Sequence, residues 1–196
     1  MENEKLLLER TYAALDPERL NNALTLIERA PKIYIIGHDI SLPVVDFMVI
    51  RLRYLGLDVE PLDFGSVHHM TTCISQSTAD TLFVLVSFPV HSTEMQAVAA
   101  LLHKRGFPVL AIVNDEDCGA AAHATQVLCC DTSDLLFYNS ITSAISMVNL
   151  ICSEYASLHQ DHLMEARQRI QAVTDELAIE LQAQTTKALP TAQAEE

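Results

Sequence analysis

Short apolar runs alternate with longer amphipathic stretches between residues 32 and 158. The apolar runs, such as TLFVLVSF and FPVLAIV, contain no charged side chain, which is typical of parallel strands buried on both faces. We therefore predict strands over 32–37, 58–62, 81–87, 108–113 and 126–130. The stretches between them predict helices over 42–55, 67–78, 92–105, 117–124 and 137–158.

This alternation predicts an α/β fold, a three-layer α/β/α sandwich around a five-stranded parallel sheet of order 2-1-3-4-5. Asp16-Pro17 is a helix-start signal in front of the sandwich, and Gly56 and Gly106 are positioned to end helices within it. The expected organisation is N-terminal linker helices over 1–30, the α/β domain over 31–158, a C-terminal amphipathic helix over 159–184 and a disordered tail over 185–196.

Three loops are the candidate ligand site. In an open α/β sheet, ligands bind beyond the carboxyl ends of the strands, where the strand order reverses. This rule selects the loops over 37–41, 64–69 and 87–94. The first of them follows a buried strand with a single glycine, and the next two residues are His38 and Asp39.

Several segments over residues 5–158 resemble the sugar isomerase (SIS) domain, in the version found in RpiR-type transcriptional regulators. They are IYIIG with a following Ser41, RLRYLGLDV, DTLFVLVSFPVHSTEM, LLHKRGFPVLAIVND and LLFYNSITSAISMVNLI. The third-strand loop of SIS domains typically reads Ser-x-Ser-Gly-x-Ser/Thr followed by an acidic residue. Here Ser87 begins the corresponding run, Ser92 ends it, and Glu94 follows. Some RpiR-type regulators read Ser-Phe-Pro-Arg-Tyr-Ser-x-Glu at this loop, so Pro89 fits that group.

The resemblance implies an SIS-like domain that senses a phosphosugar or another carbohydrate derivative in transcription regulation, as a homodimer or tetramer. It implies that DNA is bound only through a helix-turn-helix domain, which we expect to be absent from this chain. The chain is then either the sensor part of a longer regulator or a solitary SIS domain. We expect the helices over 137–158 and 160–183 to form the dimer interface. The expected ligand-binding residues are Gly37, His38, Asp39, Ser41, His69, Ser87, His91, Ser92, Thr93 and Glu94.

Features of the loops favour and oppose a bound phosphate. Hydroxyls of Ser87, Ser92 and Thr93, together with a helix N-terminus, are typical phosphate ligands. Pro89 offers no N–H, and Val90 stands where the closer relatives carry arginine. A carboxylate such as Asp39 at ~5 Å from a phosphate dianion would repel it by roughly 6 kcal/mol at an effective dielectric of about 20, unless a protonated histidine offsets the charge.

Two alternatives remain open. A standalone sugar-phosphate isomerase would use a base chosen from Glu94, Asp39, His69 and His91. A metal- or haem-binding protein would use histidines of the three loops, which are His38, His68, His69 and His91. The sensor hypothesis assigns no catalytic residue, no metal ligand and no cofactor.

Charge and composition narrow the class of protein. Twelve Lys+Arg oppose 26 Asp+Glu, for a formal net charge of −14, which disfavours direct binding of nucleic acid by this chain. No apolar run reaches the length of about 18 residues that a membrane span needs, and the N-terminus is acidic where a secretory signal is basic. The five cysteines show no CxxC spacing. We therefore expect a cytoplasmic protein with no membrane partner and with reduced thiols.

Overall fold

Five parallel strands form one sheet in the computed structural model, which describes residues 2–132 and 139–188. The strands are β1 (Ile33–Gly37), β2 (Val59–Leu62), β3 (Leu82–Ser87), β4 (Val109–Val113) and β5 (Gln126–Cys129). They lie in the order β2-β1-β3-β4-β5, and every neighbouring pair is parallel. The predicted sheet and its strand order are confirmed.

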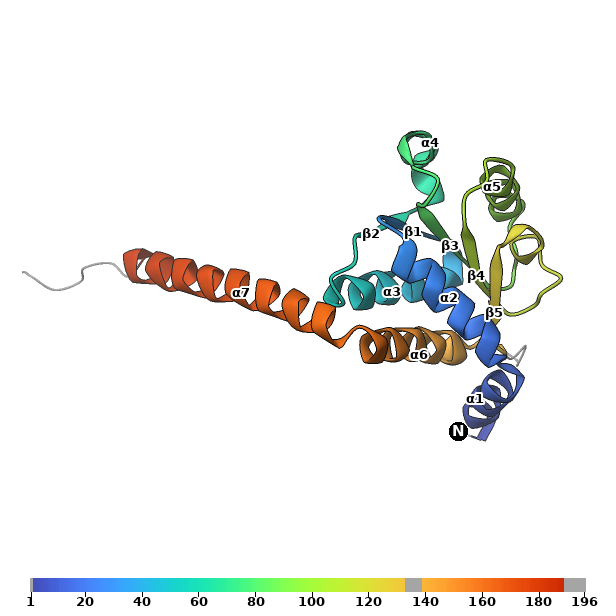
Figure 1. Cartoon of the computed structure of the whole chain (residues 1–196), viewed down its shortest axis with the longest axis horizontal. Helices are drawn as coiled ribbons and strands as arrows, with labels where there is room; N and C mark the ends of the chain where they lie inside the picture. The colour runs from blue at the N-terminus through green and yellow to red at the C-terminus, as the bar shows by residue number, and fades with distance from the viewer. Residues whose placement is uncertain (1, 133–138, 189–196) are drawn as a thin grey trace, which may run out of the picture.

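Helices cover both faces of the sheet because the strand side chains alternate between two apolar layers. Val84 packs in the layer shared with α2 (Pro17–Arg29), α3 (Leu42–Tyr54) and α6 (Thr142–Leu158). Its neighbour Phe83 packs in the opposite layer, which is shared with α4 (Val67–Gln76) and α5 (Thr93–Lys104). Residues on both faces of β3 are fully buried, which explains the uninterrupted apolar run in the sequence. The three-layer sandwich is confirmed (Figure 1).

The predicted helix signals act as expected. The Asp16 carboxylate accepts a hydrogen bond from the Glu18 backbone N–H at 2.9 Å, and Pro17 occupies the first turn of α2. Gly56 (φ 83°) and Gly106 (φ 78°) follow α3 and α5 in the left-handed conformation that glycine adopts without strain. These local choices fix where each helix turns back toward the sheet.

The segment over 117–124 was predicted as a helix, and this is wrong. It forms turns and one short 3₁₀ helix, η3 (Ala121–His123). The Asp115 carboxylate accepts from the Asp117 N–H at 3.0 Å, so a turn replaces the first turn of an α-helix. The buried side chains of Cys118 and Ala121 lie three residues apart, a spacing that imitates an amphipathic helix.

The remaining helices lie at the two ends of the chain. Helix α1 (Glu2–Ala14) packs on α6, where the Tyr12 and Ser146 hydroxyls are 2.6 Å apart. Helix α6 starts at Thr142 rather than at 137, and residues 137–138 lie outside the described residues. Helix α7 (Gln160–Ala188) projects from the sandwich (Figure 1) and passes the predicted boundary at residue 184. Residues 189–196, the rest of the predicted tail, also lie outside the described residues.

Across the described parts of the chain, every helix is too short or too polar to traverse a lipid bilayer.

Candidate functional site

The strand register brings the first and third loops to the same edge of the sheet. Gly37 pairs with Val86, so β1 and β3 end within one residue of each other. A Cβ added at Gly37 would lie 2.4 Å from Cγ2 of Val45. Glycine at this position therefore serves the close packing of α3 on β1.

Two contacts join the three loops. The Ser41 hydroxyl accepts a hydrogen bond from the Phe88 N–H at 3.3 Å, and Ser41 is only 1% exposed. The His38 ring meets the Phe64 ring edge-on, with ring centroids 5.8 Å apart. Phe64 begins η2 (Phe64–Ser66), the short 3₁₀ helix after β2. The loops over 37–41, 64–69 and 87–94 thus meet at the carboxyl edge, as the sequence predicts.

The third loop holds a hydroxyl and an imidazole together. Ser87, the buried last residue of β3, has its hydroxyl 3.0 Å from Nδ1 of the exposed His91. Ser92 caps α5, because its hydroxyl accepts from the Met95 N–H at 3.1 Å. The loop therefore presents the His91 ring to solvent and the N-terminus of α5 to the same edge.

Two carboxylates of the loops are already engaged. Asp39 has a φ of 47° and lies 3.0 Å from Nδ1 of His38, with its own side chain 80% exposed. At α5, the Thr93 hydroxyl donates to Glu94 at 3.3 Å. A hydrogen bond from its own backbone N–H, and then the Thr93 hydroxyl, lower the pKa of Glu94. Glu94 is therefore stabilised as an anion by its neighbours, and Asp39 contacts the His38 ring.

A cleft of about 510 Å³ opens beside the third loop, at the ends of β3, β4 and β5. The Asn139 side chain donates to the Pro89 carbonyl at 3.2 Å across it, which ties the approach to α6 to the third loop. Asn114, directly after β4, has a buried Oδ1 with no hydrogen-bond partner among the described residues. The cleft is lined by Asn3, Leu7, Arg10, Pro89, Asn114, Asp131, Thr132 and Asn139.

The cleft residues that lie in α1 or directly after β4 and β5 were not predicted from the sequence. Asn114 follows the apolar run VLAIV at the same edge as the three loops, and this position is a signal that the sequence does carry. Arg10 carried no comparable signal, because only the docking of α1 brings its guanidinium 3.7 Å from the Asp131 carboxylate. Arg10 is the cation among the described residues that line the cleft.

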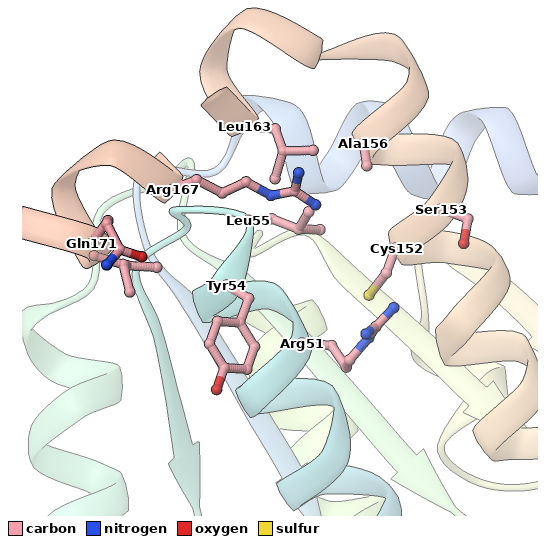
Figure 2. A pocket seen from close by; sticks show the side chains of 10 residues that line it. Arg51, Tyr54, Leu55, Cys152, Ser153, Ala156, Leu163, Arg167 and Gln171 are labelled. Carbon is pink, nitrogen blue, oxygen red and sulfur yellow. The ribbon is translucent and has the colours of Figure 1, made fainter. Parts of the chain in front are cut away.

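A second cavity of about 470 Å³ lies where α3, α6 and α7 meet (Figure 2). Arg51 and Tyr54 line it from the last turns of α3, and Cys152 and Arg167 line it from α6 and α7. Helix α3 starts at the carboxyl edge of β1 and runs to the opposite edge. This cavity is therefore remote from the edge where open α/β sheets bind ligands.

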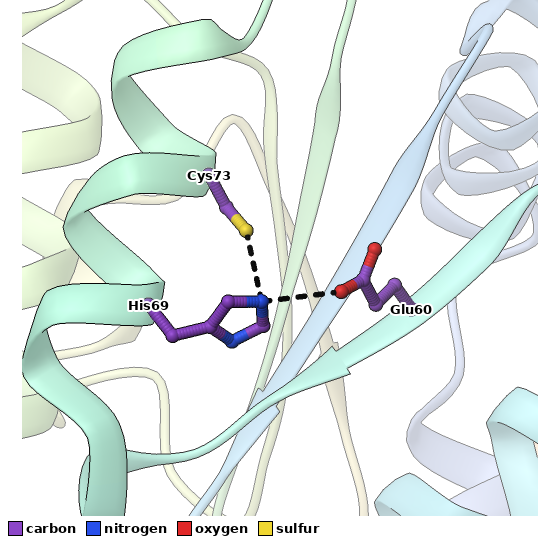
Figure 3. Close-up of side chains that lie close together, drawn as sticks. All are labelled: Glu60, His69 and Cys73. Atoms are coloured by element: carbon purple, nitrogen blue, oxygen red, sulfur yellow. Dashed lines mark hydrogen bonds and ion pairs between the residues drawn. The ribbon is translucent and has the colours of Figure 1, made fainter.

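His69 does not join the other predicted ligand residues. It lies in the first turn of α4, and its Nε2 is 3.5 Å from Oε1 of Glu60 on β2 and 3.5 Å from Sγ of Cys73 (Figure 3). His38 contacts Asp39 and Phe64, and His91 contacts Ser87. Among the described residues, the loop histidines are therefore not assembled into one metal or haem site.

Comparison with protein-family models gives no match, and comparison with curated proteins also gives none. Solved structures do match. The sugar isomerase domain of an RpiR transcription factor from Sphaerobacter thermophilus has a TM-score of 0.83 and 23% identity, covering 87% of this chain and 95% of that one. Vibrio vulnificus NanR, complexed with ManNAc-6P, has a TM-score of 0.77 and 20% identity, covering 90% of this chain and 67% of that one.

A third similar structure is that of a Methanococcus jannaschii protein for which a function of 3-hexulose-6-phosphate isomerase has been inferred. Its TM-score is 0.61 at 19% identity, and the alignment covers 84% of this chain and 93% of that one. All three likenesses extend over most of this chain. At these identities they establish the fold.

Proposed function

We propose that this chain, which has the sugar isomerase (SIS) domain fold, is the cytoplasmic ligand-sensing domain of an RpiR-type regulator. Its ligand is a phosphosugar or a related carbohydrate derivative, bound in the cleft at the carboxyl edge of the sheet. The observation that carries the proposal is the cleft itself, which opens at the carboxyl edge of the sheet and is lined by polar side chains such as Arg10, Asn114 and Asn139. The amide side chains can exchange hydrogen bonds with sugar hydroxyls, and the guanidinium can bind a phosphate.

The charges around the cleft are compatible with an anionic ligand. Arg10 is 61% exposed and forms a 3.7 Å ion pair with Asp131, which also lines the cleft, so a phosphate would compete with that carboxylate for the guanidinium. Ser87, whose hydroxyl contacts His91, and the N-terminus of α5 lie on the same loop as Pro89, which lines the cleft. Asp39 lies 3.0 Å from Nδ1 of His38 and is not among the residues that line the cleft.

The state of Glu94 favours sensing over isomerisation. An aldose–ketose isomerase needs a base whose pKa lies near the working pH. The pKa of Glu94 is lowered by its own backbone N–H and by Thr93, which makes this carboxylate a weaker base. The likenesses to an RpiR transcription factor and to NanR with ManNAc-6P support the same choice, because their TM-scores of 0.83 and 0.77 exceed the 0.61 of the inferred isomerase.

We assign the dimer contact to α7 and the adjoining surface of α6. Ile170, Val173 and Leu177 repeat at intervals of three and four residues along α7 and are 40%, 64% and 57% exposed. An apolar stripe of this spacing on a projecting helix fits a second copy of the same helix. Because α1 both lines the cleft and packs on α6, a bound ligand has a direct route to that contact.

The function is tested by measuring thermal unfolding with ManNAc-6P, 3-hexulose-6-phosphate and other sugar phosphates. A ligand at 100 times its Kd should stabilise the fold by ~2.7 kcal/mol. The stabilisation should be lost in Asn114→Ala and Ser87→Ala and kept in Ser75→Ala, a control on the exposed side of α4. If no sugar phosphate stabilises the protein, the proposal is wrong. Turnover abolished by Glu94→Gln would instead establish an isomerase.

The dimer is tested separately by light scattering. The wild-type chain should be a dimer, and Val173→Asp should be a monomer because a charge enters the apolar stripe. Gln168→Asp adds the same charge away from the stripe and should leave the dimer intact. A wild-type monomer, or a dimer unaffected by Val173→Asp, contradicts the assignment.

A further inference from the structure

Three side chains of different metal-binding classes converge beside β2, away from the cleft. Glu60 lies on β2, and His69 and Cys73 lie one turn apart on α4 (Figure 3). The Nε2 atom of His69 is 3.5 Å from the Cys73 sulfur and 3.5 Å from Oε1 of Glu60. All three donor atoms lie within 4.8 Å of one another. One imidazole nitrogen therefore faces a thiol and a carboxylate at once.

These separations fit the edges of a metal coordination tetrahedron. With zinc bonds of about 2.3 Å to sulfur and about 2.1 Å to nitrogen and oxygen, tetrahedral angles place S and N roughly 3.6 Å apart and N and O roughly 3.4 Å apart. The observed value is 3.5 Å for both pairs. The third edge, from the Cys73 sulfur to the Glu60 carboxylate, is within 4.8 Å, so a metal ion would fit between these atoms once the thiol and the carboxylate have closed to tetrahedral spacing.

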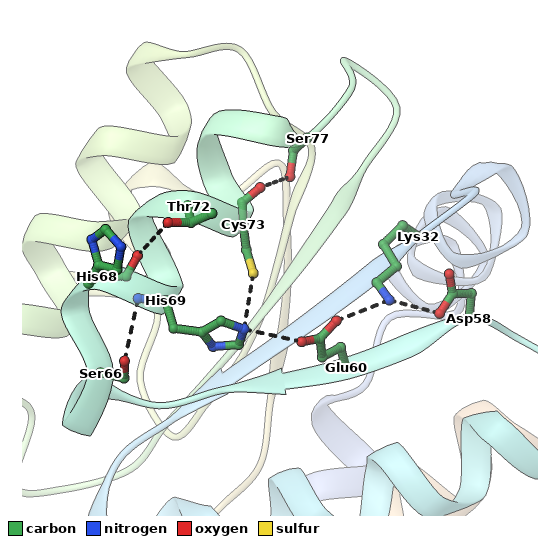
Figure 4. Close-up of polar contacts among 9 residues, drawn as sticks. All are labelled: Lys32, Asp58, Glu60, Ser66, His68, His69, Thr72, Cys73 and Ser77. Atoms are coloured by element: carbon green, nitrogen blue, oxygen red, sulfur yellow. Dashed lines mark hydrogen bonds and ion pairs between the residues drawn. The ribbon is translucent and has the colours of Figure 1, made fainter.

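Neighbouring groups hold two of the three ligands, Glu60 and His69, in position. Lys32 Nζ is 3.2 Å from Oε2 of Glu60 and 2.8 Å from Oδ1 of Asp58, so it binds the carboxylate oxygen that faces away from His69 (Figure 4). The Ser66 hydroxyl accepts from the His69 N–H at 3.4 Å and fixes the start of α4. Such outer contacts orient metal ligands in known sites.

The local charges suit a divalent cation. With Cys73 as thiolate, one lysine stands among three anions, namely the thiolate and the carboxylates of Glu60 and Asp58. The two negative charges that remain are neutralised by one M²⁺ ion. The His69 side chain is 53% exposed, so solvent reaches the fourth coordination position. A thiolate and an imidazole together select zinc-like transition metals over magnesium or calcium.

We propose that Glu60, His69 and Cys73 bind one zinc ion or a similar divalent transition-metal ion, with water as the fourth ligand. The site differs from the loop-histidine site considered from the sequence, since His38 and His91 take no part. It is also independent of the ligand cleft, because none of its residues lines that cleft.

The test uses the full chain, stripped with a chelator and titrated with Co²⁺ and Zn²⁺. We expect one equivalent to bind, with a cobalt–thiolate charge-transfer band. Cys73→Ser should remove the band, and His69→Ala and Glu60→Gln should each weaken zinc binding by at least about tenfold. His68→Ala is the matched control, since His68 is exposed in the same turn of α4 and its side chain lies outside the cluster. Circular dichroism of the metal-free variants reports whether they are folded.

Each outcome decides the proposal. A band that is kept in His68→Ala and His38→Ala but lost in Cys73→Ser supports the site. No stoichiometric metal in the wild-type chain, or equal affinity in folded His69→Ala and wild type, overturns it. If His38→Ala removes the cobalt band instead, the metal is bound by the loop histidines and the proposal is wrong.

Discussion

The ligand cleft draws its residues from α1, the ends of three strands and the approach to α6, whereas the Glu60–His69–Cys73 cluster draws on one strand and the helix that follows it. The cleft therefore exists only when segments more than a hundred residues apart have docked, as the Asp131 N–H to Thr11 hydroxyl bond at 2.9 Å illustrates. The cluster needs only the β2–α4 unit and the sheet beside it. Substitutions in the shared core should therefore impair both sites. Substitutions in the loops should impair one site and leave the other intact.

The largest expected effect is that of Phe83→Ala. Phe83 is fully buried on β3 and contacts the rings of Tyr34 and Phe107, at centroid distances of 5.5 and 5.1 Å. The cavity left by its ring should lower the free energy of unfolding by about 3 to 5 kcal/mol, measured by urea denaturation. Ligand and metal binding should weaken together. Leu158→Ala, at a 65% exposed position, is the control and should change stability by no more than about 0.5 kcal/mol.

Gly37→Ala should impair the ligand cleft and leave the Glu60–His69–Cys73 cluster intact. The new methyl group would lie 2.4 Å from Val45 Cγ2, so α3 and the first loop must shift, at a cost of about 1 to 3 kcal/mol. Sugar-phosphate stabilisation should be lost while the cobalt band is kept. In urea denaturation, Gly37→Ala/Val45→Ala should lose less stability than the sum of the two single variants, because the clash is removed. Simple additivity would show that the clash is not the cause.

The fold could be predicted largely because its strands are buried on both faces. Runs such as TLFVLVSF leave little choice of element, and parallel strands joined by helices allow few topologies. The helix predicted over 117–124 was wrong because buried side chains at Cys118 and Ala121 have helical spacing in an irregular turn. Periodicity records which side chains are buried, and a turn that buries the same positions gives the same pattern.

The meeting of three loops could also be predicted, since it follows from the strand order alone. The direction in which a helical side chain points could not be predicted from the sequence. Ser66 caps α4, and this starting point turns His69 toward Glu60 instead of toward His38. For the same reason the Glu60–His69–Cys73 cluster could not be predicted from the sequence. A histidine and a cysteine four residues apart form a candidate metal site only when β2 places a carboxylate beside them. Arg10 was missed because α1 had no predicted docking surface.

Ser41→Ala should disturb the cleft side alone, with a smaller cost than Gly37→Ala. The variant leaves the buried Phe88 N–H without its acceptor, which should reduce stability in urea by about 1 to 2 kcal/mol. Because this bond joins the first and third loops, the Kd for a sugar phosphate should rise. Zinc affinity should stay unchanged. A parallel loss of zinc affinity would mean that the two sites are coupled through the sheet.

Ser66→Ala is the reciprocal variant on the cluster side. It removes the N-cap of α4, whose hydrogen bond to the His69 N–H is long at 3.4 Å, so we expect a loss of about 0.5 to 1 kcal/mol in urea. Fraying of the first turn should loosen His69 and weaken zinc binding, measured by competition with a chelator. Sugar-phosphate stabilisation should be retained. Loss of the sugar-phosphate effect with zinc binding intact would reverse the assignment of the two sites.

The smallest expected effect concerns the docking of α1, which supplies part of the lining of the cleft. The Ser140 hydroxyl donates to the Glu4 carboxylate at 2.7 Å, and this bond, with a second one from Thr142, lowers the pKa of Glu4. A carboxyl group with a lowered pKa in the folded state stabilises that state above its unfolded pKa, here 4.5, and the stabilisation declines as the pH falls below this value.

Urea denaturation of the metal-free chain between pH 7 and pH 3 measures this contribution of Glu4. Wild type should be slightly more stable than Glu4→Gln at pH 7, and the difference should shrink below pH 4.5 as the carboxylate is protonated. In a Ser140→Ala background the difference should be smaller at every pH, because the main hydrogen-bond donor to Glu4 is gone. A difference that persists at pH 3, or that does not respond to Ser140→Ala, would show that the charge of Glu4 does not help to hold α1 in place. The hydroxyl contact between Tyr12 and Ser146, the Asp131 N–H bond to Thr11 and the buried Leu7 would then hold α1 beside the cleft.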